Sequence, residues 1–526
     1  MELYSKHYEK ISELRYNFEK ILQRLKVETD FETKLQLAMF AADYFVYNNT
    51  GYFTSSILET FFVDYARKIK ADLKNIDYNK NSVLHVMSKG YLTGGHTRVV
   101  ERWIENAPNT QKHSVVFTRK NSVGLKVLEQ NVKNKNGEYV LLGNLSSLEE
   151  KAIQLRKLAM EYEYVILHTH MDDPIPIVAF GVEEFTRPVF LYNHASHRAW
   201  LGKSIADLVL DLEEDDEVTK IKRGITNTYF LGVPSKKISL TIADKIEVRK
   251  KLNLPLDKKI IVTSGSDARY REICGNNFID YLKEIMDEDT YCYVIGIAPE
   301  NSAWKKIKEE TNNRVVTLGF IDFDKGFCEY LKAADLYLDS YPLCGGTAMI
   351  DAISSGTPAI SLKSVYPQFD YLTRTTAYCQ TKDEFIKKAK RVLVDSKYAI
   401  EIFEELKSSL LEYQSIEAWN KRIENLYNNA PKIHRVKYLS NVKDYAENND
   451  LSVLCNVIDN RNFLNDTQMK LFSDNDLDNF ISFGNLYKIQ GIPLVFQIFS
   501  YKKGLKKIKI FKLFNIKIFS YVKNNN

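Results

Sequence analysis

A short stretch in the second half of the chain carries the residue types of a phosphate-binding turn. Gly345 and Gly346 follow an apolar run and precede a helical pattern that begins at Thr347 and stops at Gly356. Glycines let the backbone approach a ligand, and a helix N-terminus offers unpaired N–H groups to an anion. Asp351 lies one turn after Thr347 on the same side, so it can accept hydrogen bonds from ribose hydroxyls while Thr347 holds phosphate. An ordinary strand-to-helix turn without a ligand is the alternative.

The same stretch resembles the nucleotide-sugar site of GT-B glycosyltransferases, particularly the O-GlcNAc-transferase-like group. The family pattern G-x-T-T-x-x-D followed by G-x-P is nearly reproduced by Gly345, Thr347, Ala348, Asp351, Gly356 and Pro358. Gly346 stands where the family has a histidine and Ala348 where it has a second threonine, so one phosphate contact is not carried over. Retaining members have two glutamates eight residues apart, and the first of these positions is Leu343 here. This favours inversion of the anomeric centre.

Two arginines are candidates for holding a diphosphate. The segment from Ser264 to Arg271 follows the first strand pattern of its lobe. The resemblance implies a basic residue in this loop that stabilises the leaving group, with Arg269 as the first candidate and Arg271 as the alternate. Arginine makes paired, charge-assisted hydrogen bonds to phosphate oxygens. A solvated arginine without a ligand is the alternative.

A second glycine pair occurs in a loop near residue 95. Gly94, Gly95 and His96 follow a strand pattern that ends at Val86. The loop resembles the GG loop of many bacterial glycosyltransferases, which implies that its backbone lies near the diphosphate or the acceptor.

Two histidines are candidates for the general base. An inverting transfer needs a base that takes a proton from the acceptor, and the pKa of imidazole lies near the operating pH. His194 ranks first because the segment from Asn193 to Asp207 resembles a recurrent segment of bacterial GT-B enzymes, and His168 ranks second. A structural histidine at a strand end is the alternative for both.

A metal site is the other chemistry that these histidines could perform. Two histidines three residues apart, His194 and His197, are a possible zinc pattern. Further candidate ligands from the preceding strand end are His168, His170, Asp172 and Asp173. The resemblance implies no metal, because helix dipoles and basic side chains neutralise the departing nucleotide. We therefore expect no metal and no cofactor apart from the nucleotide-sugar substrate, which is expected to be UDP-linked.

The elements that must position these residues alternate between strand and helix patterns. Apolar runs typical of buried strands occur at 83–86, 113–117, 140–142, 165–167 and 189–192, and again at 260–263, 291–297, 315–318, 336–338 and 359–361. Strands separated by helices form parallel sheets that are covered on both faces. We predict an α/β fold with two Rossmann-like lobes facing a cleft, as in GT-B enzymes, with a helical N-terminal extension and a helical, basic C-terminal extension.

Four regions follow from these patterns. Residues 1–80 are a helical N-terminal region, 81–240 the acceptor-side lobe, 241–430 the nucleotide-sugar lobe, and 431–526 a helical extension with a basic, apolar tail. A helix predicted at 416–428 is expected to cross back to the first lobe. Lysines and no acidic residue occur in the last 36 residues, so the tail is expected to contact an anionic membrane surface. Packing on the protein's own surface and disorder are the alternatives. Ile508, Ile510, Ile516 and Ile518 alternate there as in a strand.

Composition limits the class of protein. The net charge of +5 over 526 residues is too small to indicate nucleic-acid binding. Six cysteines without CxxC spacing indicate reduced thiols in a cytoplasmic protein. No apolar run reaches 18 residues and the N-terminus is charged, so we expect neither a spanning helix nor a signal peptide.

The sequence therefore predicts a cytoplasmic glycosyltransferase, peripheral at the inner membrane face if the tail binds lipid. The expected partners are a nucleotide sugar and a glycan or protein acceptor, and the expected process is synthesis of a bacterial surface glycan such as capsule or lipooligosaccharide. A protein O- or N-glycosyltransferase, a sugar-nucleotide epimerase and a non-catalytic scaffold with this fold remain alternatives.

Overall fold

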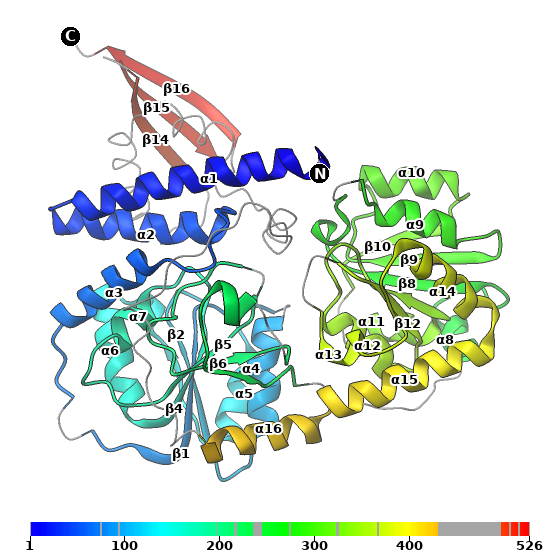
Figure 1. The fold of residues 1–526 in the computed structure, drawn as a ribbon, viewed down its shortest axis with the longest axis horizontal. Helices are drawn as coiled ribbons and strands as arrows, with labels where there is room; N and C mark the ends of the chain where they lie inside the picture. Colours follow the sequence, from blue (N-terminus) through cyan, green and yellow to red (C-terminus); the bar gives the residue numbers. More distant parts are fainter. Residues whose placement is uncertain are drawn as a thin grey trace.

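The computed structural model describes residues 2–429 and three strands near the C-terminus. Inside the first range it leaves out 74–75, 93–94, 122, 197, 215–217, 235–244, 273–274, 322–325 and 365–367, and the strands cover 496–503, 506–513 and 516–524. Figure 1 shows two α/β lobes side by side, a helical layer above the first, and a pair of helices that runs beneath both.

The first lobe is built on a seven-stranded parallel sheet. In spatial order its strands are β3 (Tyr139–Leu141), β2 (Lys112–Phe117), β1 (Asn79–Met87), β4 (Tyr162–His168), β5 (Val189–Tyr192), β6 (Leu208–Asp211) and β7 (Thr228–Phe230). The connecting helices include α4 (Gly95–Asn106), α5 (Lys126–Asn134), α6 (Leu148–Met160) and α7 (Ile175–Phe180). The central strands are buried almost throughout, as expected of parallel strands covered on both faces.

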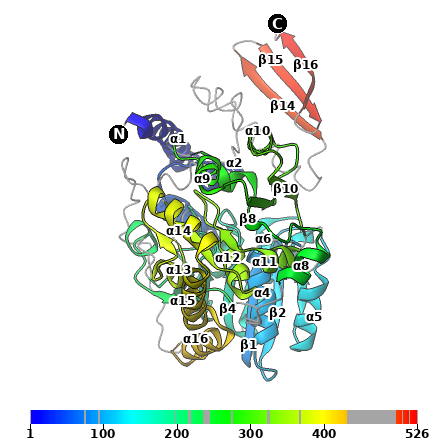
Figure 2. The same cartoon turned by 90° about the vertical axis from the view of Figure 1, so that its right-hand side faces the viewer.

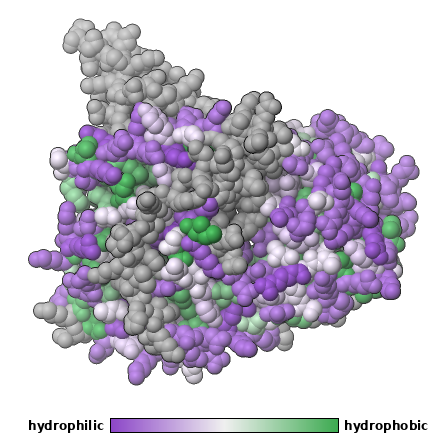
Figure 3. Space-filling view, viewed as in Figure 1, coloured by the Kyte–Doolittle hydropathy of each residue, from purple (hydrophilic) through white to green (hydrophobic). Residues whose placement is uncertain are grey.

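The second lobe repeats the plan with six parallel strands. Their order is β10 (Val315–Gly319), β9 (Thr290–Ile295), β8 (Lys259–Ser264), β11 (Leu336–Leu338), β12 (Ala359–Leu362) and β13 (Tyr378–Cys379). Its helices are α8 (Lys245–Lys251), α9 (Phe278–Ile285), α10 (Ser302–Glu310), α11 (Phe327–Ala333), α12 (Thr347–Ser354), α13 (Asp370–Thr373) and α14 (Lys382–Val394). The face of this lobe seen in Figure 3 is mostly hydrophilic.

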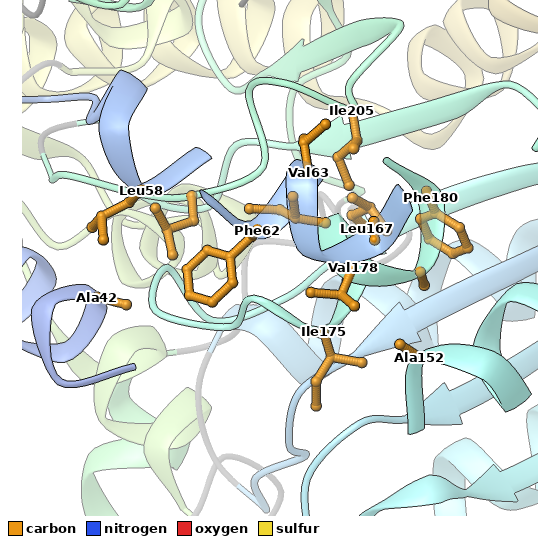
Figure 4. Close-up of a cluster of buried hydrophobic side chains, with 14 of the residues drawn as sticks. Ala42, Leu58, Phe62, Val63, Ala152, Leu167, Ile175, Val178, Phe180 and Ile205 are labelled. Atoms are coloured by element: carbon orange, nitrogen blue, oxygen red, sulfur yellow. The ribbon is translucent and has the colours of Figure 1, made fainter. Parts of the chain in front are cut away.

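The N-terminal helices share a core with the first lobe. They are α1 (Glu2–Val27), α2 (Phe31–Tyr47) and α3 (Ser56–Lys68), and Leu58, Phe62 and Val63 of α3 pack against the first lobe (Figure 4). The buried carboxylate of Glu59 accepts hydrogen bonds from the backbone N–H groups of Gly202, Lys203 and Ser204 at 2.6, 3.2 and 3.1 Å. A buried charge of this kind is tolerated only with such partners, so this contact fixes α3 in place.

The helix pair beneath the lobes joins them. α15 (Ser396–Gln414) belongs to the second lobe, whereas α16 (Ile416–Asn429) lies against the first, as Figure 1 shows. Trp419 packs edge-on against Trp103 of α4 with ring centroids 5.3 Å apart, and Arg422 Nε donates to the carbonyl of Leu231 at 2.9 Å. The prediction that the last helix crosses back is confirmed.

The two-lobe fold class is confirmed, and the tail forms strands, as the alternating isoleucines at 508–518 indicated. β14 (Phe496–Lys503), β15 (Lys506–Leu513) and β16 (Ile516–Asn524) form an antiparallel sheet, so this part of the extension is not helical. Its alternating residues favour a strand over a helix. In both views it lies at the same end of the molecule as the N-terminus (Figures 1 and 2). The predicted helices at 431–490 lie outside the described residues. Among those that are described, no helix is long and apolar enough to cross a membrane.

Candidate active site

The glycine turn of the second lobe is supported from below by Asp339. This carboxylate follows β11 and is buried; its Oδ1 accepts from the N–H of Gly345 at 2.5 Å, and its Oδ2 accepts from Ser361 Oγ at 2.8 Å. A Cβ on Gly345 would lie 2.7 Å from that same Oδ1, so the turn has no room for a side chain. Gly346 has a φ of +54°, which side chains rarely tolerate. Gly345 is therefore required by the close approach of the Asp339 side chain, and Gly346 by its backbone conformation.

Burial strongly affects the carboxyl group of Asp339. It raises the pKa of Asp339 to about 6, and the hydrogen bonds from Ser361 and Gly345 oppose that rise. Asp339 could not be singled out as a site residue from the sequence, because a single aspartate at a strand end is common. That Asp339 supports the glycine turn is evident only from the structure, in which both carboxylate oxygens accept hydrogen bonds.

α12 begins directly after the turn and carries the two predicted polar contacts. Thr347 and Asp351 are both half-buried on this helix. Asp351 acts across the lobes on Arg102 of α4: burial lowers the pKa of Arg102, and the negative charge of Asp351 opposes the shift. The ribose-binding candidate therefore faces the first lobe.

The two candidate arginines have different surroundings. Arg269 lies in a 3₁₀ turn (Asp267–Tyr270) and donates to the carbonyl of Cys344, the residue before the glycine pair. Arg271 is exposed and forms an ion pair with Asp267 at 3.8 Å. Arg269 therefore contacts the glycine turn.

Four imidazoles form a hydrogen-bonded chain through the first lobe. Nε2 of His85 lies 2.9 Å from Nδ1 of His113, and Nδ1 of His85 lies 3.1 Å from Nε2 of His168. Nδ1 of His168 in turn lies 3.0 Å from Nε2 of His194. At the far end, Nε2 of His113 lies 2.8 Å from Oε1 of Gln111. We call this set the imidazole chain.

The chain follows a diagonal across the sheet. His113 is opposite Val83 on β1, and His168 is opposite Met87, so His85 lies two residues from each of these positions on one face. His194 continues this diagonal, because it lies two residues beyond the end of the next strand, β5. Diagonal neighbours in a sheet are within reach of long side chains.

His194 occupies the open end of the chain. It is half-buried, whereas His85, His113 and His168 are fully buried. It lines a pocket of about 20 Å³, room for one water or hydroxyl, together with His170 and Trp200. The indole Nε1 of Trp200 is buried and has no hydrogen-bond partner among the described residues. His168 has both nitrogens bonded to other histidines, so it has none free for an acceptor.

Two more histidines, His96 and His170, lie near His194. The ring of His96 lies 3.7 Å from that of His194, centroid to centroid, and the ring of His170 lies 5.9 Å from that of His96. Nε2 of His170 is 3.2 Å from the hydroxyl of Tyr91. The predicted loop residue His96 is thus beside the candidate base. Gly95 begins α4 with open space around it, whereas Gly94 and His197 lie outside the described residues.

Burial keeps these imidazoles neutral. It lowers the pKa of His96 and of His113 to about 3, with smaller contributions from His170 and from Lys135 respectively. Burial, followed by neighbouring histidines, lowers the pKa values of His85, His168 and His194 well below the usual 6.5. The expectation from the sequence that the pKa of the candidate base lies near the operating pH is therefore not met by either His194 or His168. In the described ranges, no group of three or more His, Cys, Asp or Glu side chains is arranged to hold a metal ion.

Several solved structures similar to this chain are glycosyltransferases. HepE of Anabaena in complex with UDP-glucose has a TM-score of 0.51 and 15% identity, covering 66% of this chain and 99% of its own. A glycosyltransferase of Rickettsia africae ESF-5 has a TM-score of 0.52 and 13% identity, covering 68% of this chain and 100% of its own. No family model matches the chain, and neither does any curated protein. The two-lobe fold predicted from the sequence is thus the GT-B fold found in these glycosyltransferases.

Proposed function

We propose that the protein is a glycosyltransferase that moves a sugar from a nucleoside diphosphate to an acceptor hydroxyl or amide. The observation that carries the proposal is the glycine turn supported by Asp339, with Arg269 against it and Asp351 facing the other lobe. Such a turn offers backbone N–H groups, a helix N-terminus and a guanidinium to a diphosphate. The structure of HepE with UDP-glucose supports a UDP-linked donor.

Each residue has a part in the proposed reaction. Arg269, Thr347 and the N-terminus of α12 bind the diphosphate and stabilise the charge that develops as it leaves. Asp351 accepts hydrogen bonds from the ribose hydroxyls. The acceptor donates its proton to His194 as its oxygen or nitrogen attacks the anomeric carbon, and the bond from that carbon to the diphosphate oxygen breaks.

The acceptor group is proposed to enter the pocket beside His194. The buried, unpartnered indole N–H of Trp200 supplies a donor for an acceptor oxygen, and His194 supplies the base. We further propose an inverting reaction, supported by Leu343 where retaining enzymes have a glutamate, and an acceptor in bacterial surface glycan synthesis. The basic composition of the last 36 residues supports peripheral binding at an anionic membrane.

A thermal-shift panel tests the donor site. UDP, GDP, CMP and dTDP, with their sugars, are titrated against wild type, Asp351→Ala and the matched control Asp383→Ala, an exposed residue of α14. A nucleotide that binds only the native protein raises Tm by mass action. We expect UDP and a UDP-sugar to stabilise wild type and the control, and the response to weaken in Asp351→Ala. No response of wild type to any nucleotide would overturn the proposal.

A further inference from the structure

The imidazole chain ends, away from the pocket, on the side-chain amide of Gln111. Its Oε1 lies 2.8 Å from Nε2 of His113, so that nitrogen carries the proton and donates it. We infer that Gln111 fixes the direction of every hydrogen bond in the chain and makes Nδ1 the proton-accepting nitrogen of His194. The catalytic use of that nitrogen rests on the proposed function, whereas the tautomer does not.

The direction follows from the chemistry of a neutral imidazole, which has one N–H and one lone pair. With the proton of His113 on Nε2, its Nδ1 must accept from Nε2–H of His85. His85 then accepts at Nδ1 from Nε2–H of His168, and His168 accepts at Nδ1 from Nε2–H of His194. His194 is left with a bare Nδ1. A proton transferred to that atom meets a ring whose N–H is already bonded.

The chain can hold one direction only while its members are neutral, because an imidazolium donates from both nitrogens. At the outer end, Lys135 helps to keep His113 neutral. Its Nζ donates to Asn109 Oδ1 at 2.7 Å, and its positive charge disfavours protonation of His113. Among the described residues, the other groups whose charges act on the chain are histidines. Lys89, Arg119, Asp172 and Asp173 act on His170, which lies outside the chain.

Packing keeps the middle of the chain free of competing partners. Trp103 lies edge-on to both His85 and His168, with ring centroids 5.2 and 5.8 Å away. Tyr192 covers His168 from β5, at 5.4 Å between centroids. These rings leave His85 and His168 with the histidine partners described above. Gln111 is the half-buried residue through which the direction of the chain can be changed from outside.

Three substitutions in the full chain test the inference. The ammonium group introduced by Gln111→Lys has only donors, so Nε2 of His113 must accept. This reverses the direction of every hydrogen bond in the imidazole chain and places the proton of His194 on Nδ1. The carboxylate introduced by Gln111→Glu only accepts hydrogen bonds at pH 8, so the native direction of the hydrogen bonds is kept. Gln130→Lys makes the same change at an exposed position of α5 and is the matched control.

The readout is the tautomer of His194 in magic-angle-spinning 15N–13C spectra of histidine-labelled protein, assigned with His194→Gln. We expect Nε2–H in wild type, Gln111→Glu and Gln130→Lys, and Nδ1–H in Gln111→Lys. For Gln111→Lys we also expect roughly a 100-fold lower kcat with an unchanged UDP-induced Tm shift. Nδ1–H in wild type, or an unchanged tautomer in a folded Gln111→Lys protein, overturns the inference. Native tautomers without any nucleotide response refute the transferase proposal and leave the role of Gln111 standing.

Discussion

The rings of His96 and His194 face each other with centroids 3.7 Å apart, so protonating either places a charge against its neighbour. Their pKa values, and those of His85, His113, His168 and His170, are lowered mainly by burial. All six lie in the first lobe, whereas residues 245–429 contain no histidine. The two lobes should therefore respond differently to acid.

We predict that the first lobe unfolds between pH 6.5 and about 5. Each of these histidines binds a proton in the unfolded chain near pH 6.5 and binds it more weakly in the folded protein. Their contribution to stability is therefore complete above pH 6.5 and is lost as the pH falls. Five of them, all except His170, have pKa values lowered to about 3 or well below 6.5. These five lower the free energy of unfolding by up to about 7 kcal/mol per pH unit, against a usual stability of about 5–15 kcal/mol.

Circular dichroism and hydrogen exchange between pH 7.5 and 4.5 measure the acid unfolding of each lobe. Peptides of the first lobe should exchange rapidly near pH 5 while peptides of the second lobe remain protected. Simultaneous unfolding of both lobes, or a first lobe still protected at pH 4.5, contradicts the prediction.

Because of Asp339, the stability of the second lobe should depend on pH in the opposite direction. Its folded pKa of about 6 is above the unfolded value of 3.8, so its contribution to stability is complete below pH 3.8 and is lost as the pH rises through 6. The shift corresponds to a loss of about 3 kcal/mol. We expect the stability of Asp339→Asn relative to wild type to rise across this window. Urea unfolding followed by hydrogen exchange in the second lobe measures it, and a difference that stays constant with pH refutes the shift.

Arg269 and Arg271 provide a matched pair for the donor site. Arg269→Met removes the guanidinium beside Cys344 and should weaken UDP binding by about 10- to 100-fold, since a hydrogen bond to a charged group contributes about 1.5–3 kcal/mol. Arg271→Met removes an exposed charge that forms an ion pair with Asp267 at 3.8 Å, and it should change binding less than threefold. Isothermal titration calorimetry with UDP compares them. Equal losses in both variants would mean that neither side chain is selectively placed at the diphosphate.

The sequence was sufficient for the alternating elements because their signals are local. Apolar runs predicted β5 and β11 with their observed bounds, and the crossing of α16 followed from the family resemblance. The strands β6 and β7 were missed: each is short, and an acidic cluster directly follows Leu210. The helix α15 was missed between two helices that were predicted.

The donor turn was predictable for the same reason, since Gly345, Thr347 and Asp351 are near one another in the sequence. The imidazole chain was not. His85, His113 and His168 occur singly on three strands, and only the order β2-β1-β4-β5 and its register bring them together. A histidine in, or directly after, the strand patterns at 83–86, 113–117 and 165–167 was the available signal.

Gly345 and Gly124 differ in the space that a side chain would have, and this difference gives the last prediction. A Cβ at Gly345 meets Asp339 Oδ1 at 2.7 Å and the hydroxyl of Tyr337 at 3.1 Å, both on buried side chains. Gly345→Ala must displace that carboxylate, so we expect a loss of about 1–3 kcal/mol in the stability of the second lobe and a weaker UDP response. Gly124→Ala enters open space in the exposed loop before α5 and should leave both unchanged. Chemical denaturation and UDP titration compare the two variants. If Gly345→Ala is as stable and as responsive as Gly124→Ala, the support of the turn by Asp339 is not what shapes the donor site.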